Sequence, residues 1–320
     1  MTISQLLNKG FLVLEHKSQT PDLDSEVLLS FVLHKNKAYL ISHRDIEVST
    51  SQRNLFLKLV KKRSSGLPIA YLTHTKEFYG LPFYVNEEVL IPRPETEELV
   101  DLAFNQIIEV IKGGEKALNI IDVGTGCGNI GITLIHNIIE QKLNAKTKFS
   151  FYLTDISGKA LKIAKRNFKR LVKKHENIKV FFVKTDLLKG INKDFDIIIS
   201  NPPYIPAKDL EYLAPGVRDF EPRVALDGGE GGLEVVKRLV SQSVDRLVEE
   251  GVLLFEIHET HPNKVKFILN GKYKGWKASF FRDSFGEWRF TKIKSKRKSQ
   301  NCNAKVKNEK IQANLAGRMN

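Results

Sequence analysis

Cysteine is scarce in this sequence, and long hydrophobic runs are lacking. Only two of the 320 residues are cysteine, Cys127 and Cys302, and they lie far apart along the chain. Two such residues give neither a disulfide framework nor the ligand spacing of a zinc site. No apolar run approaches the roughly 20 residues that a helix needs to cross a bilayer, and residues 1–10 lack the features of a signal peptide. The sequence therefore predicts a cytoplasmic protein without a bound metal.

The composition otherwise fits a soluble enzyme with room for two domains. Hydrophobic residues make up 42% of the chain and charged residues 28%, with a formal net charge of +14. Residues 292–320 hold nine cations and one anion, so the rest of the chain carries only about +6. Aromatic residues are missing from this basic stretch, which disfavours base stacking. Two interpretations stay open for it: a solvated, disordered extension, or a weak contact with ribosomal or other RNA.

The first part of the chain has the apolar spacing of helices. This spacing predicts helices over residues 3–14, residues 24–33 and around Leu59, with Pro68 as the stop signal. Residues 76–92 then change to aromatic and β-branched side chains with turn signals at Gly80 and Pro82. We therefore expect a helical N-terminal domain over residues 1–75, joined by a β-hairpin linker over residues 76–92 to a second domain.

From residue 93 onward, apolar runs alternate with helical patterns, as a parallel sheet with crossover helices requires. The predicted strands cover residues 117–123, 149–154, 178–183, 195–200 and 251–257. Several of these runs are apolar almost throughout, which is typical of strands buried on both faces. Runs around residues 276–282 and 288–293 predict an antiparallel edge hairpin. The second domain is thus an α/β domain over residues 93–293, followed by a basic tail over residues 294–320.

The first predicted strand runs into a glycine-rich loop, Gly124-Thr125-Gly126-Cys127-Gly128. Glycines allow the backbone to turn sharply and to approach a ligand that a side chain would block. Gly126, Gly128 and Gly131 also satisfy the dinucleotide fingerprint, which leaves a nicotinamide enzyme as an alternative. This motif alone is a weak signal for any one cofactor.

Carboxylates at the ends of successive strands favour S-adenosylmethionine as the cofactor. Asp122 would face its ammonium group, and Asp155 would accept hydrogen bonds from both ribose hydroxyls. Asp186 lies where the adenine amino group is expected, with Leu187 as an apolar wall. Because the carboxyl ends of parallel strands meet at one edge of a sheet, these side chains are expected to cluster. Helix capping is the alternative role for Asp155 and Asp186.

The fourth predicted strand ends in Asn201-Pro202-Pro203-Tyr204, which carries the predicted chemistry. Each proline forces the preceding residue out of the helical region and lacks an N–H donor, so this segment is a rigid wall of acceptors. The Asn201 side-chain oxygen and the Pro202 carbonyl could each accept one N–H of a planar nitrogen, whose lone pair then faces the sulfonium methyl. Tyr204 would stack on the planar group. We assign catalysis to Asn201, Pro202 and Tyr204; an ordinary proline turn is the alternative.

Three further stretches make the sequence resemble the HemK/PrmC family of protein-glutamine methyltransferases over most of residues 1–293. They cover residues 77–80, 91–97 and 217–226. The resemblance implies a class I S-adenosylmethionine-dependent methyltransferase of Rossmann-like fold whose helical N-terminal domain helps to hold a class 1 peptide chain release factor. The glutamine of the factor's Gly-Gly-Gln motif would be methylated on its side-chain amide nitrogen, with S-adenosylhomocysteine as the product, and translation termination would be modulated.

By position, the resemblance implies cofactor contacts from residues 124–128, Asp155 and Leu187, and contact of Asn201 with both cofactor and substrate. It also implies a glutamine pocket lined by the rest of the tetrapeptide, namely Pro202, Pro203 and Tyr204. Asp186 is added to the cofactor site on geometry alone.

Other polar stretches have two interpretations each. Residues 94–97 begin a helix or touch the cofactor, and Arg218, Glu221 and Arg223 form a substrate rim or only brace their loop. Glu256, His258, Glu259 and His261 are interpreted as a solvated turn rather than a metal cluster. Cys127 is expected to be a small loop residue without a base to activate it.

Two other functions fit part of the sequence. A DNA adenine methyltransferase shares the tetrapeptide, because the adenine amino group is also planar, but the N-terminal helices lack a dense basic face. An RNA-associated cofactor-binding protein without catalysis would use the basic tail as an anchor. The complete acceptor wall over residues 201–204 favours an enzyme.

Overall fold

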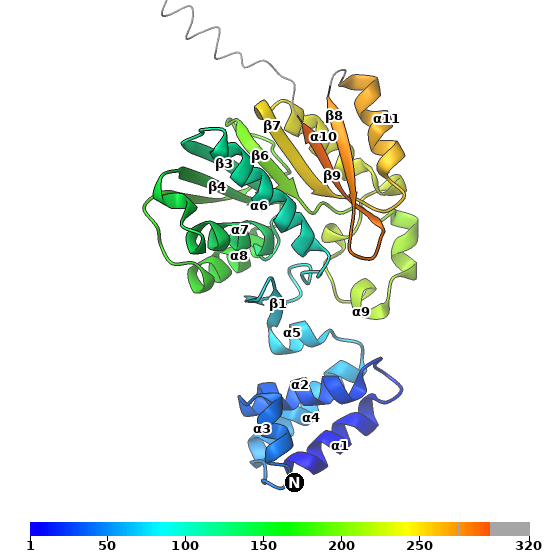
Figure 1. Ribbon diagram of the computed structural model, residues 1–320. Helices are drawn as coiled ribbons and strands as arrows, with labels where there is room; N and C mark the ends of the chain where they lie inside the picture. The colour runs from blue at the N-terminus through cyan, green and yellow to red at the C-terminus, as the bar shows by residue number, and fades with distance from the viewer. Residues whose placement is uncertain (274–275, 295–320) are drawn as a thin grey trace, which may run out of the picture.

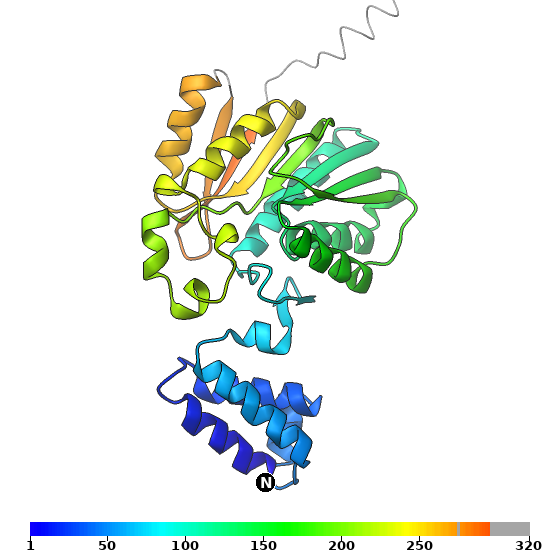
Figure 2. The same ribbon diagram turned by 180° about the vertical axis from the view of Figure 1, so that it is seen from behind.

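The computed structural model describes residues 1–273 and 276–294 and places a group of helices beside a larger α/β part (Figures 1 and 2). The first helices are α1 (Ile3–Leu14), α2 (Pro21–Leu33), α3 (Lys37–Ser42), α4 (Thr50–Ser64) and α5 (Ile69–Thr73). Pro68 does not end this helical region as predicted: it precedes the first turn of α5, where a residue without an N–H is tolerated. Within the described ranges, no helix has both the length and the apolar character to cross a membrane.

Close packing of α1 against α2 and α4 determines the shape of the N-terminal helices. The Thr2 side chain accepts from Gln5 N, and the Gln5 side chain accepts from Thr2 N, which together start α1. A Cβ atom at Gly10 would lie 2.0 Å from Ser25 Oγ and 2.8 Å from Phe56 Cζ. Gly10 therefore allows three helices to meet around the buried Phe56 ring.

A short antiparallel hairpin connects the helices to the α/β part, as predicted. It comprises β1 (Thr75–Phe78) and β2 (Leu81–Tyr84), which pair with Phe78 opposite Leu81. Tyr79 and Gly80 form the two-residue turn with φ of 55° and 72°. Two positive φ values in succession give the turn whose twist matches that of the flanking strands.

The α/β part is built on one seven-stranded sheet with the order β5-β4-β3-β6-β7-β9-β8. Its strands are β3 (Ala117–Val123), β4 (Lys148–Asp155), β5 (Ile178–Lys184), β6 (Phe195–Ser200), β7 (Leu247–Glu256), β8 (Lys277–Arg282) and β9 (Trp288–Lys294). The pairs among β3 to β7 are parallel, whereas β9 is antiparallel to both β7 and β8. The predicted mostly parallel sheet with an antiparallel edge hairpin is confirmed.

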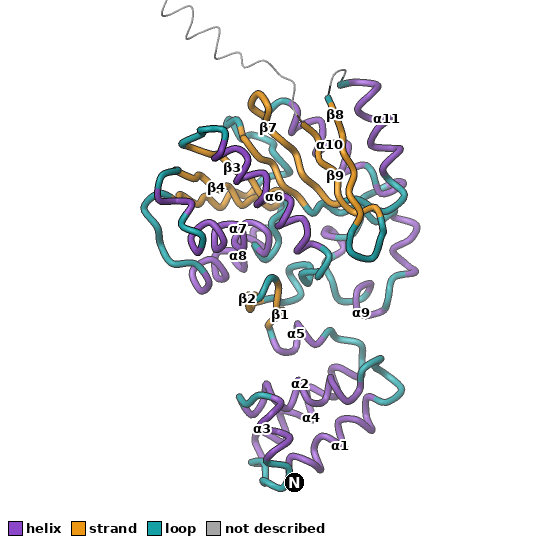
Figure 3. Tube along the Cα trace, viewed as in Figure 1, coloured by secondary structure: helices purple, strands orange, loops and turns teal. Residues whose placement is uncertain are grey.

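Helices cover both faces of this sheet (Figure 3). They are α6 (Thr96–Lys112), α7 (Asn129–Glu140), α8 (Gly158–Leu171), α10 (Glu234–Val244) and α11 (Pro262–Lys272). The connecting segments add the short α9 (Pro215–Arg218) and the 3₁₀ turns η1 (Leu143–Ala145), η2 (Ala207–Tyr212), η3 (Arg223–Ala225) and η4 (Glu230–Gly232). Ile120 and Ile197 share a hydrophobic cluster with α6, α7 and α8, whereas Ile121 and Ile198 share another with α10 and α11. Successive strand residues point to opposite faces, so the apolar strands feed two cores.

Most of the predicted basic tail lies outside the described residues. Of residues 294–320, the structure describes Lys294 alone, as the last residue of β9.

Asn167 of α8 connects the hairpin to the glycine-rich loop. Its Oδ1 accepts from Tyr84 N at 2.8 Å, and its Nδ2 donates to Tyr84 O and to Cys127 O, both at 2.9 Å. Asn167 is fully buried. The hairpin and the glycine-rich loop are thus both hydrogen-bonded to the Asn167 side chain. Because this side chain is buried, water cannot take its place as a partner.

We expect Asn167→Asp to lower the free energy of unfolding by about 3 kcal/mol, because the carboxylate keeps the acceptor but loses both donors and is buried beside two carbonyls. Urea denaturation measures this change. Asn54→Asp, at an exposed position of α4, is the matched control. Equal stability of the two variants would contradict the connecting role.

Candidate active site

A cavity lies where the strand order reverses between β3 and β6. Successive strands step outward from β3 to β4 and β5 on one side, and from β6 to β7 on the other. Loops that leave the carboxyl ends of β3 and β6 therefore diverge and open a crevice, where open α/β sheets bind ligands. A cavity of about 620 Å³ occupies this place, and its lining includes Gly124, Asp155 and Asn201.

The glycine-rich loop forms one wall of the cavity. Gly124, Gly126 and Gly128 have φ of 71°, 56° and 88°, in the region that side chains disfavour. At Gly128 a Cβ would also lie 2.5 Å from Ile132 Cδ1, so a larger residue would force the Ile132 side chain to shift. Thr125 N donates to Thr154 O at 2.8 Å, which holds the loop against the end of β4.

Asp122 braces this loop from beneath instead of facing the cavity, which corrects the prediction of an ammonium contact. It is buried, and its Oδ2 accepts from Thr125 Oγ1 at 2.6 Å and from Gly131 N at 3.0 Å. Burial raises the pKa of this carboxyl to about 6. A carboxylate that already takes the Gly131 N–H also disfavours a pyrophosphate at the start of α7, which argues against the nicotinamide alternative.

Asp155 lies at the cavity edge at the end of β4, where the ribose was predicted. Its Oδ1 accepts from Ser157 N at 2.8 Å and its Oδ2 from Gly126 N at 2.9 Å, and burial raises its pKa. The residue that caps α8 is Ser157, whose side chain accepts from Ala160 N, so the capping alternative for Asp155 is wrong. Each oxygen keeps a second lone pair for a ligand hydroxyl.

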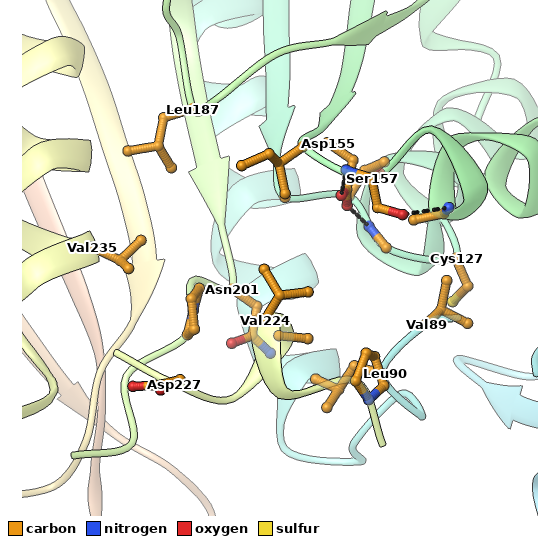
Figure 4. Close-up of a pocket in the computed structure, with 18 of the residues that line it drawn as sticks. Val89, Leu90, Cys127, Asp155, Ser157, Leu187, Asn201, Val224, Asp227 and Val235 are labelled. Atoms are coloured by element: carbon orange, nitrogen blue, oxygen red, sulfur yellow. Dashed lines mark hydrogen bonds between the residues drawn. The ribbon is translucent and has the colours of Figure 1, made fainter. Parts of the chain in front are cut away.

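Apolar side chains from three elements form the far end of the cavity. Ile156 is a large apolar side chain, yet 52% of its surface is exposed. It lines the cavity with Leu187 and Val235. In the close-up, Leu187 and Val235 lie on one side, Val89 and Cys127 on the other, and Asn201 between them (Figure 4). Such walls suit a flat aromatic ring such as adenine.

Asp186 also lines this end, but its carboxylate forms an ion pair with Arg238 of α10. No α-helix separates β5 from β6 among the described residues, so Asp186 caps none. Its predicted contact with the adenine amino group stays a prediction. Sequence reasoning missed Ile156, Val235 and Arg238. Ile156 could have been predicted as a cavity residue because it directly follows Asp155 at a strand end. Val235 and Arg238 of α10 have no sequence pattern nearby that indicates a ligand site.

The predicted acceptor wall is only partly at the surface of the cavity. Asn201 and Pro203 line it, whereas Pro202 is buried and Tyr204 lies outside the lining. Tyr204 contacts Arg289 by a hydrogen bond, and burial raises its pKa to about 12. The stacking of Tyr204 on a planar substrate therefore stays a prediction. Asn201 Nδ2 donates to Thr96 Oγ1 at 3.2 Å, and the Asn201 side-chain oxygen has no donor among the residues that the structure describes.

The loop after the wall both borders the cavity and is braced. Glu221 is buried and accepts from Arg93 Nη2 at 2.6 Å and from Ile91 N at 3.1 Å, which connects this loop to the residues after the hairpin. Arg223 lines the cavity and pairs with Asp227. Both interpretations of the stretch therefore hold, with Glu221 as brace and Arg223 as rim. Arg218 pairs with its exposed neighbour Asp219 and donates to Glu211 O at 3.4 Å.

The predicted solvated turn after β7 is wrong for two of its residues. Glu256 and His261 are buried, with exposed fractions of 2% and 0%. His261 Nε2 lies 3.1 Å from Gly231 O, and burial lowers its pKa to about 4, so the ring is neutral at pH 7. The prediction considered only the alternation of side chains along the strand. It did not include α6, whose first turn covers Glu256. Within the described ranges, no group of His, Cys, Asp and Glu side chains could hold a metal ion.

Cys127 is a buried loop residue, as predicted. It is 1% exposed, and burial raises the pKa of its thiol to about 12. The thiolate is therefore unpopulated at neutral pH, and Cys127 is not a nucleophile.

We expect ionisation of Glu256 to destabilise the protein above neutral pH. Burial raises its pKa from 4.5 to about 7. The stability that the protonated carboxyl contributes is thus complete below about pH 4.5 and is lost as the pH rises through about 7. Relative to the wild type, Glu256→Gln should gain on the order of 3 kcal/mol in unfolding free energy between about pH 5 and pH 8. Chemical denaturation across this range measures the gain; the exposed Glu259→Gln should show none, and a pH-independent difference would contradict the assignment.

Comparisons with known proteins agree with this geometry. Residues 5–73 match the family described as PrmC N-terminal domain, and residues 96–214 match the Methyltransferase small domain. A release factor glutamine methyltransferase of Bacillus cereus is 38% identical over 247 residues, which cover 76% of this chain and 82% of that protein. Proteins of the same name from Rhodopirellula baltica and Leptospira interrogans are 36% and 34% identical, with coverage of 80% and 90% of this chain and 84% and 96% of their own. On this evidence, the chain belongs to the release factor glutamine methyltransferase family.

Proposed function

We propose that this protein transfers the methyl group of S-adenosylmethionine to the side-chain amide nitrogen of the glutamine in the Gly-Gly-Gln motif of class 1 peptide chain release factors, and so modulates translation termination. One observation carries the proposal: the glycine-rich loop, Asp155 and the Asn201 side chain line the same cavity. Family membership supplies the substrate class.

The residues of the cavity fit S-adenosylmethionine. Asp155 offers acceptors to two ribose hydroxyls, Ile156, Leu187 and Val235 offer an apolar slot for adenine, and the bare glycines allow the rest to approach the backbone. When bound, this cofactor supplies an activated sulfonium methyl and leaves as S-adenosylhomocysteine.

Positioning of the acceptor is the contribution of Asn201 and Pro202. An amide nitrogen is a weak nucleophile because its lone pair is delocalised into the carbonyl. In our proposal the Asn201 Oδ1 and the Pro202 carbonyl each accept one N–H of the glutamine, which turns the lone pair toward the methyl group. Asn201 and Pro202 would hold the amide nitrogen toward the methyl group that S-adenosylmethionine would supply, and the amide proton would pass to solvent after transfer. Binding that favours this geometry accelerates transfer without a strong base.

Other parts of the chain have roles in this proposal as well. The N-terminal helices over residues 1–75 would hold the release factor, while the linker over residues 76–92 and the domain over residues 93–293 present the cavity to its tip. The basic tail would give a weak contact with RNA or the ribosome. The proposed place of action is the cytoplasm, where termination occurs.

The direct test is incubation with labelled S-adenosylmethionine and three acceptors: an intact release factor, a factor whose tip glutamine is replaced, and duplex DNA. Label is expected on the intact factor alone. Label on DNA alone would replace the proposed substrate with adenine.

We expect Asn201→Ala to abolish transfer, because the acceptor N–H then lacks one of its two partners, while cofactor affinity stays within roughly tenfold, or about 1.4 kcal/mol. Single-turnover transfer and a cofactor dissociation constant measure the two effects. Asn54→Ala on α4 is the control. Normal transfer by Asn201→Ala would remove this residue from the mechanism.

Asp155→Ala should chiefly weaken cofactor binding, by about 10- to 100-fold, because two charge-assisted hydrogen bonds to ribose are lost together with the bond from Gly126 N. Calorimetric titration with S-adenosylhomocysteine measures the dissociation constant, with the exposed Asp45→Ala as control. An unchanged constant would refute the ribose role.

A further inference from the structure

Three polar side chains from distant parts of the sequence, Asn201, Thr96 and Glu256, meet at the acceptor wall. Ser200 and Phe255 are paired on the adjacent strands β6 and β7. The next residues along the chain, Asn201 and Glu256, therefore lie side by side where these strands end. The first residue of α6, Thr96, lies over both: its Oγ1 accepts from Asn201 Nδ2 at 3.2 Å, and its hydroxyl favours the ionised form of the Glu256 carboxyl. Thr96 and Glu256 are 1% and 2% exposed, so no bulk water competes.

While Glu256 is ionised, the donors and acceptors in this chain of three residues can be arranged in only one way. An ionised carboxylate only accepts hydrogen bonds, so the single hydroxyl proton of Thr96 goes to Glu256. The Thr96 oxygen is then left as an acceptor toward Asn201, and Asn201 must present its NH2 group to it. Its other end, the Oδ1 acceptor, therefore faces the cavity that Asn201 lines.

The opposite amide orientation would be unproductive. A 180° turn of the Asn201 side chain would point NH2 into the cavity, where it meets the N–H groups of the substrate amide as one donor against another. It would also place Oδ1 against the lone pairs of Thr96 Oγ1. Both contacts are repulsive, and buried polar groups without partners cost about 1–3 kcal/mol each. Nitrogen and oxygen of an amide have nearly the same shape, so only such hydrogen bonds distinguish the two orientations.

We propose that Thr96 and Glu256 are positioning residues that fix the amide orientation of Asn201, so that its oxygen and not its NH2 group faces the acceptor nitrogen. This inference rests on the proposed function, because it assumes that Asn201 accepts a hydrogen bond from the substrate. Neither residue touches the reacting atoms. The charged groups around Glu256 are Arg289 of β9, and Arg93 and Glu95 before α6.

Thr96→Val tests the proposal, since valine keeps the shape of the side chain and removes only the hydroxyl. We expect kcat for release factor methylation to fall about 100-fold, because Asn201 is no longer held in one orientation. KM for the factor and the cofactor dissociation constant should stay within about threefold of the wild type. Thr96→Ser restores the hydroxyl and should return kcat to within about tenfold of the wild type. All assays are run at about pH 8.5, above the raised pKa of Glu256.

Thr133→Val is the matched control. Thr133 of α7 is fully buried as well, but its hydroxyl has no hydrogen-bond partner in the described structure. Its replacement should leave kcat unchanged, which separates a specific effect of Thr96 from the loss of any buried hydroxyl. Thermal unfolding of each variant reports whether it is folded.

Glu256→Met gives an independent reading and decides the question if Thr96→Val does not fold. Without the carboxylate, the Thr96 proton is free to turn toward Asn201, and kcat should fall at least about tenfold while cofactor affinity is kept. A smaller loss in kcat for the variant that folds, a serine variant as slow as the valine variant, or an equal loss of cofactor affinity would each overturn the proposal.

Failure of this inference is distinguishable from failure of the proposed function. If the wild type labels the release factor and Asn201→Ala does not, but Thr96→Val is as fast as the wild type, only the positioning role fails. If the wild type leaves the factor unlabelled, the proposed function fails and the inference with it.

Discussion

The pairing of β3 with β6 is the constraint on which the site depends. Val123 lies opposite Ser200 in this parallel ladder, so the glycine-rich loop and Asn201 leave the sheet at the same level. Ser200 Oγ donates to Val123 O at 2.8 Å at that point. A slip of one residue along either strand would turn its apolar side chains to the wrong face and would also separate Asn201 from the loop. The hydrophobic alternation that stabilises the sheet therefore positions the chemistry.

Buried carboxylates surround the cavity, and each holds a segment that the chemistry needs. Asp122 holds the glycine-rich loop, Glu221 holds the loop after the acceptor wall, and Glu256 lies beneath Thr96. Burial of a carboxylate opposes folding unless hydrogen bonds replace its hydration. Glu221 has two such partners, whereas Asp122 and Glu256 each keep one oxygen without a partner. The pKa values of Asp122 and Glu256 are raised because these hydrogen bonds do not fully replace the lost hydration.

Methyl transfer to an amide nitrogen depends on positioning of the acceptor more than on a strong base. Asn201, Pro203 and Thr96 line the cavity together with charged side chains, among them Arg93 and Asp227. Histidine is present nearby as His261, but burial keeps its ring neutral, and it contacts the backbone of Gly231. Rigid acceptors and a closed apolar slot suit a reaction whose electrophile is already activated.

Much of this protein could be predicted from local sequence patterns. Apolar runs, glycines and the double proline act through the backbone of their own neighbours, so the sheet strands, the hairpin, the loop over residues 124–128 and the extended segment after β6 were recognisable. Asp155 was correctly placed at the end of β4 for the same reason. Pro68 was misjudged because a proline is also tolerated just before a helix begins, as Pro68 is before α5.

Only the tertiary structure decided where the long-range side chains point. Asp122 follows the same pattern as Asp155, yet it turns inward because Gly131 and Thr125 supply donors there. Glu256 is buried because α6, some 160 residues earlier in the chain, begins above it. Hydrogen bonds between residues so far apart leave no periodicity in the sequence, since each depends on strand order and helix placement rather than on neighbours along the chain.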